Sequence, residues 1–389
     1  MFEQGMHKVD INYLTDIRHH LHRYPELSGE EYKTAEFIAS ELKKTDPDRI
    51  LEKVGGTGVV AVYGDDDKGP QILFRAELDA LKIPEKGNRD YKSTREGISH
   101  ACGHDGHMSV MLGVGRYLKD QRPERGRVII LFQPAEETGE GARKVLDDPK
   151  FQSLKIDRSY AFHNLPGFEK GRLFYRPGSF ASASVGLRCN LEGESSHAAY
   201  PEQGRNPSVA VADLAKLAQT FGNSDITDPD YAIATVTYIR LGEKAFGISP
   251  GHAEVGLTLR AARDSEIEWM KMQIRTELKK SAEMVGLEWQ IHEREPFTAT
   301  VNSEYCIGVV KSAANRGSVK TEQLAHPFPW SEDFGRFAEK SEIALIGIGA
   351  GKNHPHLHAY EYDFPDEIIP EAVVIFINIM NEEWSRQKH

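Results

Sequence analysis

Residues 100–107, "HACGHDGH", concentrate side chains that bind metals or take part in catalysis: three histidines, one cysteine and one aspartate. Imidazole nitrogen, thiolate and carboxylate are the protein ligands of zinc, and imidazole with carboxylate also suits manganese. Cys102 and His104 can reach one centre only from a loop or a strand-like backbone, because on a helix they would diverge. We expect Gly103 and Gly106 to give this loop its flexibility.

Acids and histidines also follow each of four predicted strands. They are Glu77 and Asp79 after "QILFRA", Glu136 and Glu137 after "RVIILFQPA", His163 after "SYAF", and His354, His356 and His358 after "ALIGIG". The crevice beyond the carboxyl ends of the strands is the usual ligand site of an open α/β sheet, so we expect these side chains to meet there. Asp79 and Asp105 are candidates to orient ligand histidines. For Asp105 and His107, both such support and direct ligation stay open.

The adjacent acids Glu136 and Glu137 can divide two tasks. On an extended backbone their side chains point in opposite directions, so one can bind metal while the other faces the water that the metal holds. A metal lowers the pKa of water from about 15.7 to about 7, and a nearby carboxylate can then pass a proton to a leaving amine. The pair therefore favours metal-assisted hydrolysis.

Other reactive side chains have simpler interpretations. Cys189 and Cys306 fall in apolar patterns that are typical of inert core thiols. The three histidines within residues 19–22 lie on a charged helix, where surface exposure or local hydrogen bonding is expected. His100 is expected only to shape its loop.

The elements that must hold these residues favour an α/β fold, a mixed sheet with helices on both faces. The predicted segments are helices at 11–24, 30–44 and 108–120 and strands at 58–63, 71–75 and 127–132. "GDDDKGP" between the first two strands has hairpin-turn chemistry. The same pattern resumes late in the chain, with a strand at "SEIALIGIG" and a helix near 366–387.

The middle of the chain predicts a second, smaller domain. Its order, β-α-β-β-α-β, is that of a ferredoxin-like α+β domain. Its longest helix is predicted to start at Asp264 as N-cap and to end before Gly286. We place this domain at 183–294, inserted between the two parts, 1–182 and 295–389, of the larger domain.

Composition and charge narrow the class of protein. The net charge of −11 over 389 residues argues against nucleic acid as a partner. No apolar run approaches the roughly 20 residues of a membrane span, and the first ten residues lack signal-peptide features. Three widely spaced cysteines fit a reducing compartment, so a cytoplasmic location is expected.

With these motifs, the chain resembles the di-metal amidohydrolases of the aminoacylase and carboxypeptidase superfamily. Its branch is that of hippurate hydrolases, N-acyl-amino-acid hydrolases and auxin-conjugate hydrolases. The matching stretches keep the family's order over nearly the whole chain and include "RHHLHRYPELSGEEYKTA", "FRAELDAL", "HACGHDGHMSVMLG", "FQPAEETGEGA", "HNLPG", "SHAAYPEQGRNP", "SEDF" and "PHLHAYEYDF".

The resemblance implies a zinc-exopeptidase-like catalytic domain with an inserted lid that usually dimerises, hence a homodimer. It implies that Glu136 is the general base and acid, and that the lid residue His197 helps to bind the substrate carbonyl, often in the partner subunit. The substrate would be an N-acyl amino acid or a short peptide-like amide. The ligands implied for two divalent ions, zinc or manganese with cobalt or nickel as options, are Cys102, His104, Glu137, His163 and His358.

Three positions depart from the family's usual pattern and leave the substrate specificity open. Glu77 stands where many relatives have aspartate, Lys82 stands where they have proline, and Gly247 replaces an asparagine that tends to contact substrate.

Three alternatives remain beside an aminoacylase. The nearest is a metallopeptidase of the dipeptidase or carboxypeptidase type. In another, Cys102 is a nucleophile activated by His104 or His107, which predicts labelling by alkylating agents and activity without metal. In the last, the chain is a metal-stabilised binding protein without catalysis.

Overall fold

The computed structural model describes residues 10–64, 68–228 and 230–386, which divide into two compact units. Unit 1 holds the described chain up to Phe180, Val301–Ala325 and the part from Asp333 onward; unit 2 holds Ala181–Thr300 and His326–Glu332. The return of the chain to unit 2 at His326–Glu332 was not predicted. It is held there because the backbone N–H and the hydroxyl of Ser182 both donate to the carbonyl of Phe328, at 3.1 and 2.8 Å.

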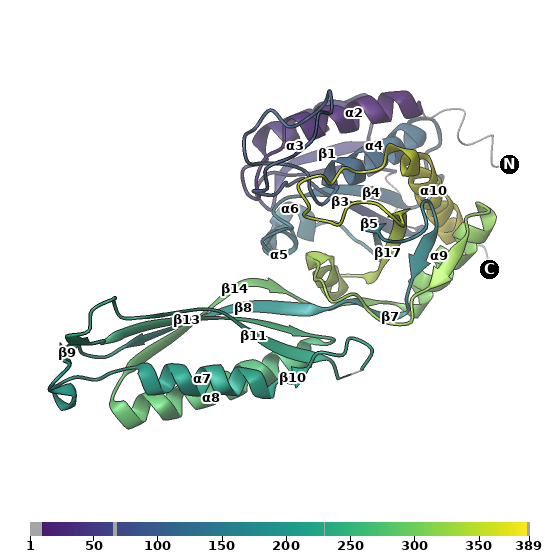
Figure 1. Cartoon of the computed structure of the whole chain (residues 1–389). Helices are drawn as coiled ribbons and strands as arrows, with labels where there is room; N and C mark the ends of the chain where they lie inside the picture. The colour runs from purple at the N-terminus through teal and green to yellow at the C-terminus, as the bar shows by residue number, and fades with distance from the viewer. Residues whose placement is uncertain (1–9, 65–67, 229, 387–389) are drawn as a thin grey trace. The chain divides into compact units, whose positions relative to one another are not determined.

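The centre of unit 1 is an eight-stranded mixed sheet of order β1-β2-β4-β3-β5-β17-β6-β16 (Figure 1). Its strands are β1 (Arg49–Val54), β2 (Gly58–Tyr63), β3 (Gln71–Glu77), β4 (Arg127–Gln133), β5 (Arg158–Pro166), β6 (Leu173–Tyr175), β16 (Thr321–Gln323) and β17 (Glu342–Gly351). Strands β4, β3, β5 and β17 are adjacent and parallel. The predicted hairpin between β2 and β3 is wrong, because β4 lies between these two strands and pairs with both.

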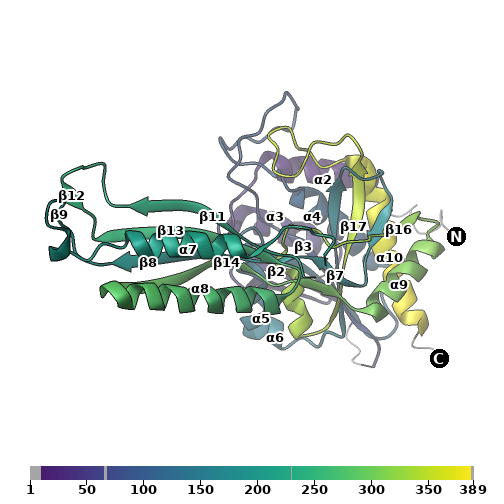
Figure 2. The same cartoon turned by 60° about the horizontal axis from the view of Figure 1, so that its bottom comes forward.

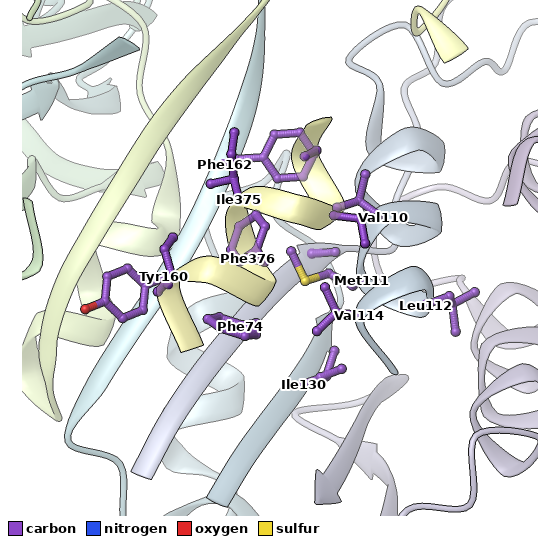
Figure 3. Close-up of a cluster of buried hydrophobic side chains, with 14 of the residues drawn as sticks. Phe74, Val110, Met111, Leu112, Val114, Ile130, Tyr160, Phe162, Ile375 and Phe376 are labelled. Carbon is purple, nitrogen blue, oxygen red and sulfur yellow. The ribbon is translucent and has the colours of Figure 1, made fainter. Parts of the chain in front are cut away.

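Helices cover both faces of this sheet, as predicted. One face carries α2 (Ile11–Arg23), α3 (Tyr32–Lys43), α4 (His104–Asp120), α9 (Glu304–Arg316) and α10 (Ile369–Arg386); the other carries α5 (Gly141–Asp147), α6 (Pro149–Gln152) and the 3-10 segment Asp333–Glu339. Alternate strand residues face the first group. Figure 3 shows Phe74, Ile130 and Phe162 of the strands packed with side chains of α4 and α10. This buried layer fixes the strand ends relative to α4.

Unit 2 is an antiparallel sheet of order β10-β11-β13-β8-β14 with α7 and α8 on one face (Figure 2). The elements are β8 (Ala183–Glu192), α7 (Ser208–Thr220), β10 (Gly222–Asn223), β11 (Ala232–Leu241), β13 (His252–Ala261), α8 (Asp264–Val285) and β14 (Glu288–Phe297). The predicted β-α-β-β-α-β order is confirmed, and Gly286 ends α8 in the left-handed conformation. The N-cap of α8 is Arg263, one residue before the prediction, because Asp264 accepts a hydrogen bond from Ala299 N instead.

Short elements complete the described chain: β7 (Gly178–Ala181), β9 (Ser196–His197), β12 (Ile248–Ser249), β15 (Thr300–Asn302) and the 3-10 turns Pro201–Gln203 and Asp366–Ile368. Over the described residues, no helix has both the length and the hydropathy needed to cross a membrane.

Candidate metal centre

The "HACGHDGH" stretch is a turn that leads directly into α4. Gly103 is the N-cap of α4 and has a left-handed φ of 95°, and a Cβ at this position would lie 2.7 Å from Asn164 Oδ1. The backbone reverses at this glycine, with Cys102 in the turn before it and His104 as the first residue of the helix. The helix therefore begins four residues earlier than the predicted residue 108.

The prediction that Gly106 gives flexibility to a loop is wrong, because Gly106 lies inside the first turn of α4. A Cβ at Gly106 would come within 2.3 Å of the ring of Phe364. This close approach requires a glycine, and it packs the N-terminal end of α4 against the segment that follows His358.

The carboxyl ends of the four parallel strands bring the predicted ligands together. Cys102, His104 and His163 offer ligand atoms that lie within 4.8 Å of one another, and so do Cys102, Glu137 and His358. Because the two groups share the thiol, they adjoin. Two further predicted histidines do not take part: within the described residues, no such group contains His354 or His356, and His354 Nε2 instead contacts the carbonyl of Asp363 at 2.6 Å.

Glu136 and Glu137 lie in a turn after β4, so the extended backbone assumed for them is wrong. The turn follows Ala135, whose φ is 50°, and is closed by a hydrogen bond from Gly139 N to Glu136 O. As a result both acids face the same imidazole. His104 Nε2 lies 3.9 Å from Glu136 Oε2 and 3.8 Å from Glu137 Oε1.

Hydrogen bonds fix the tautomers of two ligand histidines. Nδ1 of His104 lies 2.8 Å from the carbonyl of Asp79, and Nδ1 of His163 lies 2.9 Å from the carbonyl of Asn164. Because a carbonyl only accepts, both Nδ1 atoms donate, which leaves Nε2 as the nitrogen where a metal would bind in place of a proton. Nε2 of His104 is buried without a hydrogen-bond partner among the described residues, as expected of a metal ligand.

His107 is held differently. Its Nδ1 lies 2.7 Å from Glu77 Oε2 and its Nε2 lies 2.6 Å from Asn164 Oδ1. Both ring nitrogens thus face side-chain oxygens, although His107 also forms a group of possible ligand atoms with Glu77 and His104. Of the two roles left open for His107, this geometry favours support. Burial acts to raise the pKa of Glu77, but Arg75 and His107 hold that pKa well below its ordinary value.

The two candidate supporting aspartates have separate partners. Asp79 accepts from Ser28 Oγ at 2.7 Å and from the backbone N–H of Glu137 at 3.0 Å, so it anchors the turn that carries Glu137. Asp105 accepts from His22 at 2.9 Å and from Arg18 at 3.2 Å. It belongs to none of the ligand groups found in the described chain.

The sequence analysis did not predict the contact of Asp105 with the side chains of Arg18 and His22 on α2. Arg18 is fully buried and was not singled out, and His22, assigned to the surface or to local bonds, is also buried and reaches partners far along the chain. The available signal was position, since both residues lie on the face of α2 that carries Leu14 and Leu21 into the core.

The charge around the site suits a cation. Burial acts to lower the pKa of His104, but the surrounding carboxylates, Glu77 first among them, raise it to about 10. The negative potential that holds a proton on this imidazole would equally favour a divalent ion in its place. The donor set, the position of His104 Nε2 and the charge therefore all fit a metal.

The other cysteines behave as core thiols. Cys189 and Cys306 are buried, and burial raises the pKa of each thiol to about 12, so neither is reactive near neutral pH. His100 is buried in the turn, and burial lowers its pKa to about 4.

His197 lies in unit 2, on β9, which pairs with β12. Its side chain is exposed, and its Nδ1 accepts the backbone N–H of Ala199 at 3.0 Å. The neutral ring therefore carries its proton on Nε2 and can donate to an acceptor on a ligand.

Comparisons with known proteins identify the family. The model of peptidase family M20/M25/M40 matches residues 73–382. The chain is 32% identical to the N-acetyl-L-cysteine deacetylase of Bacillus subtilis (strain 168) over 93% of this chain and 85% of that protein. It is 28% identical to the hippurate hydrolase of Campylobacter jejuni over 93% of this chain and 94% of that protein. A solved dinuclear metal-binding M20 peptidase of Bacillus subtilis superposes with a TM-score of 0.80 at 25% identity, covering 96% of this chain and 99% of that one.

Proposed function

The chain belongs to peptidase family M20/M25/M40, and from this premise we propose that it is a metal-dependent amidohydrolase that cleaves the amide bond of N-acyl amino acids. The observation that carries the proposal is the convergence of thiol, imidazoles and paired carboxylates at one sheet edge. The names of the similar proteins, a deacetylase of N-acetyl-L-cysteine and a hippurate hydrolase, support amides with a small or aromatic acyl group.

The proposed cofactor is a pair of divalent cations. When bound, they would polarise the substrate carbonyl and make water more acidic. The thiolate of Cys102 favours zinc, and manganese, cobalt and nickel are the other options. The residues proposed to hold them are Cys102, His104, Glu137, His163 and His358.

Glu136 is the proposed general base and acid. Its carboxylate lies beside the proposed ligand His104, where an attacking water would sit within reach. It accepts a proton from that water as the oxygen adds to the carbonyl carbon. It then gives the proton to the nitrogen as the C–N bond breaks, which yields a carboxylic acid and a free amine.

His197 is the proposed donor to the carbonyl oxygen. The N–H at Nε2, fixed by the bond from Ala199 to Nδ1, would stabilise the negative charge that develops on that oxygen. We also propose that the protein is a homodimer and that this histidine acts in the site of the partner subunit.

The test is metal analysis with a hydrolysis screen over N-acetyl, N-benzoyl and other aromatic N-acyl amino acids, with dipeptides to detect a peptidase. Glu136→Gln is expected to lower kcat by at least 10²-fold while metal content stays the same. Glu140→Gln, an exposed neighbour paired with Lys144, is the matched control and should keep full activity. Near-normal turnover in E136Q would refute the role of Glu136. No hydrolysis of any substrate by the metal-loaded protein would favour a binding function.

A further inference from the structure

We propose that Arg18 is a positioning residue, which locks together the two chain segments that carry His104 and His358 and thereby sets the affinity for the metals. This inference rests on the proposed function, because it concerns the same ligands. Arg18 lies on α2, and its contacts are with carboxylates other than the proposed ligands, so its effect would be indirect.

The guanidinium of Arg18 contacts three carboxylates while fully buried. NH1 lies 3.2 Å from Asp105 Oδ2 and 2.7 Å from Asp363 Oδ1, and Nε lies 2.5 Å from Asp366 Oδ1. The ring of Tyr91 lies 4.7 Å from the guanidinium carbon, and its hydroxyl donates to Asp363 at 2.6 Å. A planar fork of donors is the one side chain that suits such a three-way contact.

These carboxylates belong to the two segments in question. Asp105 directly follows His104 at the start of α4. Asp363 lies on the loop after β17 that carries His358, and Asp366 begins the 3-10 turn at the end of that loop. Arg18 therefore ties the first turn of α4 to that loop, across more than 250 residues of chain.

The loop needs such a tie because His358 is held in an unfavourable conformation. Its φ is 65°, in the left-handed region that residues other than glycine adopt only where the surroundings enforce it. One constraint is the hydrogen bond from His358 N to Ala101 O at 2.8 Å, which again joins this loop to the "HACGHDGH" turn. The Arg18 contacts are a second joint between the same two segments.

Other cations also lie near the two acids, but they hold the pair less closely than Arg18 does. His22 lies 2.9 Å from Asp105 Oδ2 but 3.9 Å from Asp363 Oδ1, and Arg89, which is partly exposed, contacts Asp363. Loss of Arg18 would therefore leave each of these carboxylates with a cationic neighbour. What is lost is the closest link between the segments, because only the 3.9 Å contact of His22 with Asp363 would remain, so the expected consequence is misplacement of His358.

The sign of the effect on metal binding separates positioning from simple electrostatics. Removing a buried cation near the site would strengthen the binding of a divalent ion if charge alone mattered. Removing a positioning residue would weaken it, by on the order of 10–100-fold as for other supports of metal ligands. Lysine retains the charge but not the fork, so Arg18→Lys should also weaken binding.

The experiment measures metal stoichiometry, and the dissociation constant of Zn²⁺ by competition with a chelator, for wild type, R18M, R18K and D363N. Both Arg18 variants are expected to bind Zn²⁺ about 10–100-fold more weakly, with one of the two ions lost first, and excess Zn²⁺ should restore occupancy. D363N retains Arg18 and should show a smaller loss, and it keeps the test open if R18M does not fold.

Arg158→Met is the control for general loss of stability, since Arg158 pairs with the buried Glu383 at the opposite end of β5 from His163. It should lower the melting temperature without changing the zinc affinity. Unchanged or tighter zinc binding in folded R18M and R18K, or an equal loss in R158M, would overturn the inference. A wild type that binds no metal would instead refute the proposed function.

Discussion

For single residues, the second nitrogen of each histidine decides what the first can do. His104 and His163 each use Nδ1 on a backbone carbonyl and leave Nε2 for a metal, whereas both nitrogens of His107 face side-chain oxygens. Residue type and spacing in the sequence could not distinguish the three. The partners of the two α4 histidines lie on or just after β3 and on β5, far away in the sequence, whereas the partner of His163 is the carbonyl of its neighbour Asn164.

Cys102 tests the choice between ligand and nucleophile. Its thiol belongs to both ligand groups, so Cys102→Ala should weaken metal binding by at least the ~10–100-fold that loss of a supporting residue costs. Metal content by atomic spectroscopy and activity should fall together. Alkylation of wild type should be slow with metal present and should speed up after chelation. Full metal content in an inactive C102A protein would support the nucleophile instead.

His22 gives the protein a pH-dependent contribution to stability. Burial acts to lower its pKa, but the hydrogen bond to Asp105 and the contact with Glu85 raise it from 6.5 to about 9. A raised pKa means that the contribution is complete below about pH 6.5 and is lost as the pH rises through 9. His22→Asn should therefore be most destabilising near pH 6, and the difference should shrink by about 3 kcal/mol by pH 10.

The measurement is urea denaturation of wild type and H22N at several pH values. His252→Asn, which removes an exposed partner of Glu192, is the control and should give a small difference at every pH, because solvent screens that pair. A pH-independent difference for H22N would contradict the assignment.

At the scale of the elements, helices and strands with a clear hydrophobic period were predicted well, whereas the pairing of strands was not. The helices and strands around the site follow from hydrophobic period alone, and so does the convergence of four strand ends. The β2–β3 hairpin failed because turn chemistry is local, whereas β4, which separates these strands, comes more than 60 residues later. The start of α4 was placed too late because its first turn is polar in sequence yet buried. Arg18 was missed for the same reason, because it is a polar residue that is nevertheless buried.

Gly106 tests the contact that seats α4. Alanine is a better helix former than glycine by about 1 kcal/mol, but a Cβ here would overlap the Phe364 ring. Gly106→Ala is therefore expected to destabilise the protein by roughly 1–3 kcal/mol. The control is Gly308→Ala on α9, where the nearest atom to a Cβ is the end of Arg386 at 3.6 Å, and this change should be neutral or stabilising. Thermal unfolding of both variants gives the signs, and equal stabilisation would rule out the close approach.

For the whole molecule, the division of the chain into two units follows from the order of elements. The inserted β-α-β-β-α-β pattern was visible in the sequence, because each element is long and strongly periodic. The short return of the chain at His326–Glu332 carries no periodic signal and was invisible. Glu136 and the proposed ligands lie in unit 1, whereas His197 lies in unit 2.

Subunit mixing tests whether His197 acts in its own subunit or in the partner. If a homodimer exchanges this residue between subunits, a heterodimer of E136Q and H197A has one site with intact Glu136 from one chain and intact His197 from the other. Two inactive variants, mixed in equal amounts under conditions that permit exchange, should then recover about a quarter of wild-type activity, since half the dimers are mixed and each has one working site of two. If His197 serves its own chain, both sites of the mixed dimer are defective. Absence of recovery, with heterodimers verified by differently tagged chains, would therefore place His197 in its own subunit's reaction or remove it from the mechanism.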